Sequence, residues 1–191
     1  MDIVQRAKAI ILSPASEWRA IEPESGDAAY LFANYVAILA AIPPASELLR
    51  RLLFGWRGQR WGVHHIRHDG FFSSLFGAFL HYLAAFVVVY ALAAIIDGLA
   101  PTFSAGKNRE GAMKLAVYAM TPAWLAGAFA LVPGLGFVRG LGLLYAVYLF
   151  WLGLPVLMKP PSEKTGPYAL AAIVFAIVLW AVVGAVVGSG L

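Results

Sequence analysis

The chain has 191 residues, of which 61% are hydrophobic and 13% are charged, and its formal net charge is +4. Soluble domains carry about 25% charged residues, so this composition excludes an ordinary soluble protein and favours an integral membrane protein. The absence of cysteine excludes disulfides and thiol chemistry, and in a membrane protein so small a positive charge points to lipid headgroups, with no nucleic acid as partner.

Residues Asp2–Leu12 predict a short amphipathic helix. Its apolar face is formed by Ile3, Val4, Ala7, Ile10 and Ile11, and its polar face by Gln5, Arg6 and Lys8. Ser13 and Pro14 are typical of an N-cap and a first helical residue, so a second short helix is expected to start there. A cationic amphipathic helix beside a membrane span usually lies in the membrane interface, which we expect of residues 1–27. A solvated tail is the alternative, and the apolar core is too short for a signal peptide.

The first apolar run long enough to cross a bilayer is Ala28–Leu49. A hydrocarbon core about 30 Å thick requires roughly 20 apolar residues in a helix. Pro43 and Pro44 remove two backbone donors, so the helix is expected to kink or end there. The following segment, Arg50–Asp69, combines arginines with two tryptophans, which is typical of a membrane–water interface.

The second span is predicted within Phe71–Leu99, which is longer than one crossing needs and must therefore tilt or project. A polar connection rich in Gly and Pro, Asp97–Gly111, leads to a third span at Ala112–Val132. The short connection Pro133–Gly136 predicts a tight hairpin between the third and fourth spans.

The fourth and fifth spans are predicted at Phe137–Met158 and Tyr168–Gly188, separated by the polar turn Lys159–Pro167. Only helices and closed barrels cross lipid, and these continuous runs do not alternate as barrel strands do. The predicted fold is therefore all-α, a five-span transmembrane helix bundle in residues 28–191, with no inverted repeat of the kind many transporters carry.

Basic residues predict the orientation. With the N-terminus inside, eight lie on the cytoplasmic side and six outside, a bias that favours a cytoplasmic N-terminus; the arginines of 50–69 leave the reverse orientation as the alternative. The inner set is Arg6, Lys8, Arg19, Lys107, Arg109, Lys114, Lys159 and Lys164; the outer set is Arg50, Arg51, Arg57, Arg60, Arg67 and Arg139.

Several short strings, in their order and spacing along nearly the whole chain, resemble the bacterial form of the Yip1 domain family. They are Leu12-Ser13-Pro14 with Glu17-Trp18, Ile42-Pro43-Pro44, Asp97-Gly98-Leu99-Ala100-Pro101 with Phe103, Tyr118 with Thr121-Pro122 and Trp124, Pro133 with Leu135-Gly136, and Leu152-Gly153-Leu154-Pro155 with Met158-Lys159. The resemblance implies five transmembrane helices, a cytoplasmic N-terminus and a C-terminus on the far side. Eukaryotic members are linked to Rab GTPases and ER–Golgi traffic, but their hallmark Asp-Leu-Tyr-Gly-Pro is absent here, so Rab binding is not implied.

Asp97 is the first candidate for a site, because it ends a strongly apolar run and charge near membrane depth is costly unless paired. Lys107 is its expected partner, and Arg109 in the same connection is the next one. The cluster is interpreted either as an ion or headgroup site or as a structural pair that fixes a re-entrant loop.

Two of the polar residues inside the spans are candidates for a site. His81 is either a proton relay or a hydrogen-bonding residue between helices. Thr121 precedes Pro122, which is expected to bend the third span; the carbonyl freed there either coordinates an ion or is satisfied by the threonine and water.

His64 and His68 are spaced as metal ligands on a helix often are. The neighbouring Arg60 and Arg67 disfavour a dication, so we expect an interfacial loop there, with no metal and no cofactor. Two pairs of glycines with three residues between them allow close helix contact within one subunit or between subunits. These pairs are Gly136 with Gly140 and Gly184 with Gly188.

The chain has no Ser/His/Asp constellation, Walker loop or H-E-x-x-H motif, and we therefore expect it not to be an enzyme. The leading hypothesis is a membrane-organising or adaptor protein of the bacterial inner membrane that acts through lipid, helix contacts and an unidentified protein partner, and that forms a homo-oligomer. The alternative is a small transporter or channel with a polar path around Asp97, Lys107 and His81.

Overall fold

The computed structural model describes residues 2–25, 27–54 and 71–189. Those residues form helices and connections without a strand, and five helical stretches are long and apolar enough to cross a membrane. The stretches are Ala28–Leu53, Phe71–Phe103, Arg109–Leu131, Phe137–Leu157 and Ser162–Val186. The predicted all-α fold with five spans is confirmed.

The first span is assembled from four short pieces. Three of them are α3 (Ala28–Leu31), the π-helical turn η1 (Phe32–Val36) and α4 (Ala37–Leu39), and a turn then leads to α5 (Ile42–Phe54). Pro43 and Pro44 lie in the first turn of α5, where a missing N–H costs least. The break predicted at the double proline is thus confirmed.

The first span extends further than expected at its C-terminal end. Arg50 and Arg51, expected in the interfacial segment, belong to α5. Both pair with Glu47 one turn earlier, and the Arg50–Glu47 distance is 2.5 Å. Ion pairs of this spacing support a helix, which explains why α5 continues past Leu49.

The second and third spans differ in regularity. α6 (Phe71–Leu99) is one helix of 29 residues, about 43 Å long at 1.5 Å per residue, and the 3₁₀ turn η2 (Ala100–Phe103) follows it. The third span consists of α7 (Arg109–Ala119), α8 (Thr121–Ala126) and the 3₁₀ turn η3 (Gly127–Leu131).

The last two spans are α9 (Phe137–Leu157) and α10 (Ser162–Ser189). The fifth helix therefore starts inside the segment expected to be a polar turn. The N–H groups of Lys164 and Thr165 both donate to the carbonyl of Pro161, at 2.9 and 3.1 Å, and close its first turn. Pro167 lies inside α10 without ending it.

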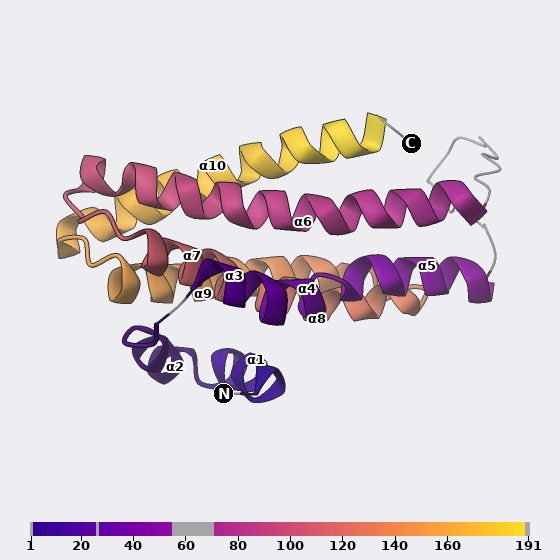
Figure 1. The fold of residues 1–191 in the computed structure, drawn as a ribbon, viewed down its shortest axis with the longest axis horizontal. Coiled ribbons are helices and arrows are strands. Elements are labelled where there is room, and N and C mark those ends of the chain that lie inside the picture. The colour runs from indigo at the N-terminus through magenta and orange to yellow at the C-terminus, as the bar shows by residue number, and fades with distance from the viewer. Residues whose placement is uncertain (1, 26, 55–70, 190–191) are drawn as a thin grey trace.

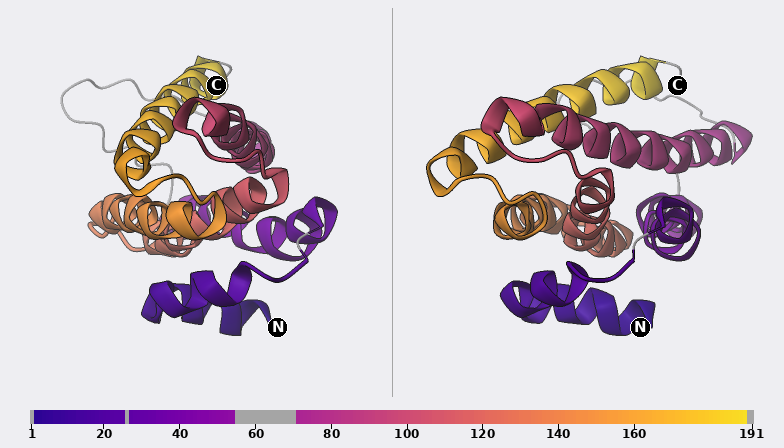
Figure 2. Two further views of the ribbon diagram at one scale, coloured as in Figure 1. Left: turned by 90° about the vertical axis from the view of Figure 1, so that its left-hand side faces the viewer. Right: turned by 60° about the vertical axis from the view of Figure 1, so that its left-hand side comes forward.

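Figures 1 and 2 show how the helices are layered. α6 and α10 form one layer, and α3–α5 with α7–α9 form the second. The N-terminal helices α1 (Ile3–Leu12) and α2 (Pro14–Ile21) lie on the other side of this second layer. The N-terminal helices and the bundle share one apolar core, because Ile10, Trp18 and Ile21 are fully buried in the same cluster as Ile96 and Leu154.

Candidate functional site

The N-terminal helices are docked on the bundle mainly through α9. The indole of Trp18 is 0% exposed and packs against Gly153, where a Cβ would lie 2.7 Å from an indole carbon. One helix end is fixed by the hydroxyl of Tyr145, which donates a 2.7 Å hydrogen bond to the carbonyl of Ile11. Most of the predicted apolar face of α1 therefore contacts protein, but Val4, which was expected on that face, is 70% exposed.

Arg6 is buried at the centre of this docking. Only 4% of the residue is exposed, and its guanidinium pairs with Glu17, itself 8% exposed, and with Glu24. The prediction that Arg6 lies on the polar face is wrong. It stands three residues after Ile3 and four before Ile10, a spacing that places all three on one helix face.

Ion pairing compensates the burial of this charge. Loss of water by itself lowers the pKa of Arg6, but the hydrogen bond to Glu24 and the negative charges of Glu24 and Glu17 outweigh that effect and raise it above its ordinary value. The guanidinium also lies over the ring of Tyr118, 5.6 Å from its centre. Arg6 thus stays charged and ties α1 to α2 and to α7.

Thr121 compensates for the backbone hydrogen bond that Pro122 removes from the third span. Proline has no N–H, so the carbonyl of Tyr118, four residues earlier, loses its helical donor. The hydroxyl of Thr121 donates to that carbonyl at 2.7 Å, and its oxygen, 2.9 Å from the hydroxyl of Tyr35, is left to accept from it. The side chain of Thr121 thus supplies the missing hydrogen bond to this carbonyl, which agrees with one of the two predicted alternatives.

Tyr35 connects this break to the first span. It lies in the π-helical turn η1, and its ring contacts that of Tyr118 edge-on, with 4.9 Å between the centroids. A polar and aromatic chain of contacts therefore runs from Arg6 through Tyr118 and Tyr35 to Thr121. We call these residues, with Glu17 and Glu24, the Arg6 network.

Lys114 holds the end of the N-terminal segment. It is buried, its ammonium lies 2.9 Å from a carboxylate oxygen of Glu110, and it donates to the backbone carbonyls of Glu22 and Glu24. Lys159 in the connection between α9 and α10 pairs with the carboxylate of Glu22. The segment after α2 is thus fixed to two different parts of the bundle.

The expected pair of Asp97 and Lys107 is not formed. The carboxylate of Asp97 accepts a 2.8 Å hydrogen bond from the backbone N–H of Asn108, and no salt bridge joins it to Lys107 among the described residues. Asn108 itself caps α7 by accepting from the N–H of Gly111 and donates to the carbonyl of Leu157. The loop is therefore held by a backbone donor and an amide side chain.

Arg109 contacts the second span rather than Asp97. Its guanidinium donates a 2.6 Å hydrogen bond to the hydroxyl of Tyr90 and lies 5.8 Å from the centre of that ring. Lys107 instead lines a polar hollow of about 490 Å³ at this end of the bundle. Two further lysines, Lys114 and Lys159, and the carboxylates of Glu22 and Glu110 also line it.

His81 lies in a different cavity. It is 16 residues from Asp97 on α6, which corresponds to about 24 Å along the helix axis. The mostly apolar cavity beside His81 shares no lining residue with the polar hollow around Lys107. Along α6, the buried side chains of Leu92, Ala93 and Ile96 lie between His81 and Asp97. The structure does not bring Asp97, Lys107 and His81 together.

Three of the four glycines in the predicted pairs have open space beside them among the described residues. A Cβ added at Gly136, Gly140 or Gly184 would meet no atom within 4 Å, and Gly188 lies one turn beyond Gly184 in α10. Other glycines permit close packing, as Gly142 does against Pro122. His64 and His68 lie outside the described residues, and the described ranges contain no group of three residues suited to hold a metal.

Sequence reasoning missed Arg6, Trp18, Lys114 and Asn108 as structural anchors. The spacing of Arg6 from Ile3 and Ile10 was an available signal. Lys114 is surrounded in sequence by buried apolar residues, which in a span indicates a paired charge. For Asn108, the available signal was an asparagine directly before a helical segment, which is a residue type preferred at the N-cap.

These features define the chain as a polytopic helical membrane protein with docked N-terminal helices. The family model of the Yip1 domain matches residues 8–183, and the chain belongs to that family. It is 26% identical over 154 residues to the inner membrane protein YohC of Escherichia coli K12, covering 79% of this chain and 77% of YohC. YohC of Escherichia coli O6:H1 matches with the same values. No solved structure matches.

Proposed function

We propose that this protein is a membrane-organising adaptor of the bacterial inner membrane, without enzymatic activity. The observation that carries the proposal is the docking of α1 and α2: their inner face is fixed by Trp18 and the Arg6 network, while Val4 and Leu12 stay 70% and 67% exposed. A rigid helical pair with exposed apolar residues suits contact with lipid or a partner chain.

The position of α1 and α2 relative to the membrane supports this proposal. Tyrosine is enriched at membrane–water interfaces, and Arg109, which donates to the hydroxyl of Tyr90, begins the third apolar stretch, so we place one interface near Arg109. The N-terminal helices, packed at this end of the bundle, would lie at the membrane surface, and the location of YohC supports an inner-membrane surface.

Photocrosslinking tests the adaptor role. A photoreactive residue at Val4 or Leu12 is expected to give a discrete protein adduct in native membranes, and the same residue at Phe137, exposed at the opposite end of α9, is expected to give lipid adducts. Arg6→Gln should weaken the protein adducts because it loosens the docking. Lipid adducts alone at Val4 and Leu12 would contradict a protein partner at this surface.

Reconstitution tests the alternative, a small transporter or channel. Proteoliposomes loaded with a pH-sensitive dye are expected to show the same proton and potassium leak as empty vesicles, because the polar hollow and the cavity beside His81 are separate. A flux that exceeds the leak and disappears in Asp97→Asn or His81→Gln would overturn the adaptor proposal.

A further inference from the structure

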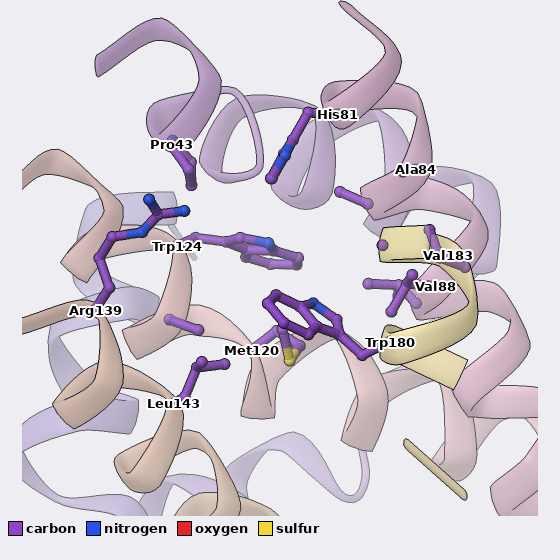
Figure 3. Close-up of a pocket in the computed structure, with 14 residues that line it drawn as sticks. Pro43, His81, Ala84, Val88, Met120, Trp124, Arg139, Leu143, Trp180 and Val183 are labelled. Carbon is purple, nitrogen blue, oxygen red and sulfur yellow. The ribbon is translucent and has the colours of Figure 1, made fainter. Parts of the chain in front are cut away.

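A cavity of about 370 Å³ lies between the two layers of the bundle. Its volume falls at the small end of the range of ligand sites. Figure 3 shows that Trp124 and Trp180 lie across its middle, with Leu143 and Met120 on one side and Val88 and Val183 on another. The cavity is therefore apolar over most of its lining.

Two side chains that can carry a positive charge line this apolar space. His81 comes from α6 and Arg139 from the first turn of α9, and both are exposed. No carboxylate of the described residues pairs with Arg139. An arginine within a membrane span normally pairs with an anionic group or contacts water. Since no carboxylate of the described residues pairs with Arg139, its guanidinium is open to an anionic ligand.

We propose that one anionic glycerophospholipid binds at this cavity, with its phosphate on Arg139 and part of one acyl chain between Trp124 and Trp180, while the rest of the lipid lies outside the cavity in the bilayer. Charge complementarity selects the headgroup, and the apolar lining selects the chain. Lipid binding here is independent of the adaptor function, because the cavity shares no residue with the Arg6 network.

The position of Arg139 in the fold suits a ligand with a charged headgroup and an apolar chain. It follows the hairpin connection Pro133–Gly136 by three residues, near one end of α9, and its long side chain can reach the headgroup level. Trp124, Met120 and Val88 lie further from that hairpin, toward the middle of the bundle. A lipid of the leaflet on the hairpin side would thus enter with its phosphate toward the hairpin and its chain toward the centre.

Tryptophan fluorescence in detergent micelles tests the proposal directly. Phosphatidylglycerol with brominated acyl chains is expected to quench the emission saturably, at one lipid per chain, and Trp180→Phe should remove a large part of that quenching. Brominated phosphatidylcholine should require a severalfold higher concentration. Unsaturable quenching that is equal for the two lipids would overturn the proposal.

Variants then test the headgroup contact. Arg139→Gln should weaken phosphatidylglycerol binding about tenfold, as the loss of one charge-assisted contact predicts, while Arg139→Lys should retain most of it. The matched control Arg109→Gln, at the other end of the bundle, should bind like the wild type. Soluble glycerol phosphate should not compete, which separates a lipid from a free phosphate.

Further outcomes would overturn the site. Unchanged binding by Arg139→Gln would exclude the arginine as the headgroup contact. Absence of saturable quenching together with a change of oligomeric state in Arg139→Gln would assign the cavity to a second copy of this chain. The thermal unfolding temperature of each variant confirms that it is folded before its binding is compared.

Discussion

The packing of α8 on α9 gives a sharp prediction, because two glycines two residues apart face different surroundings. A Cβ at Gly142 would lie 2.8 Å from the carbonyl oxygen of Pro122 and would also overlap the Cβ of Ala126. A Cβ at Gly140 would meet nothing within 4 Å. Gly142→Ala should therefore destabilise the protein, and Gly140→Ala is its matched control.

The magnitude follows from two opposing effects. Both substitutions gain up to about 1 kcal/mol of helix propensity. Overpacking costs about 1–3 kcal/mol, and the upper half of that range applies to Gly142 because a backbone carbonyl cannot rotate away. The free energy of unfolding should thus differ by about 2–3 kcal/mol between the variants, with Gly142→Ala below the wild type and Gly140→Ala at or above it.

Thermal unfolding in mild detergent measures this difference. About 1 kcal/mol shifts Tm by roughly 2–4 °C in a chain of this size, so Gly142→Ala should melt roughly 4–12 °C below Gly140→Ala. Equal Tm values for the two variants would refute the close approach of α8 and α9 at Gly142.

Three further predictions concern the loop, the topology and self-association. Asn108→Ala should lower Tm, because it removes the cap of α7 and the hydrogen bond to the carbonyl of Leu157, a loss of about 1–2 kcal/mol in the free energy of unfolding. Lys107→Met should leave Tm unchanged. The opposite ranking would restore a role for Lys107 in holding the loop. Reporter fusions at Met1 and Leu191 should report opposite compartments, since five spans separate the two ends, and a shared compartment would reject that count. Gly184→Leu with Gly188→Leu should weaken self-association in detergent while insertion is retained, because no described residue comes within 4 Å of a Cβ placed at Gly184. A monomeric wild type in detergent and in lipid would remove the basis for this expectation.

The spans were predictable from the sequence because the membrane imposes a strong constraint on length and composition. α6 spans the predicted range Phe71–Leu99, and α9 ends one residue before the predicted Met158. Boundaries failed where polar residues continue a helix: Arg50 and Arg51 extend α5 through Glu47, and the first turns of α10 lie in the expected turn.

The partners of polar side chains were harder to predict than the spans. Asp97 was singled out correctly as a residue needing a partner, but the donor is a backbone N–H, which has no signature in side-chain chemistry. The pairing of Arg6 with Glu17 depends on the turn between α1 and α2 and on the surface of α7, neither of which is encoded in the residues near Arg6. Long-range packing decides such contacts, and a single sequence leaves it open.

The central claim is that the N-terminal helices form one body with the bundle, held by the Arg6 network. Hydrogen exchange of the backbone amides of Ile3–Ile21 in lipid nanodiscs tests it most directly. Removing one partner of a buried ion pair costs about 3–5 kcal/mol, so Arg6→Gln should reduce protection there by about a hundredfold to several thousandfold. Arg6→Gln with Glu17→Gln should regain part of the protection, and the exposed control Arg19→Gln should resemble the wild type. Unprotected amides in the wild type, or unchanged protection in Arg6→Gln, would contradict the account.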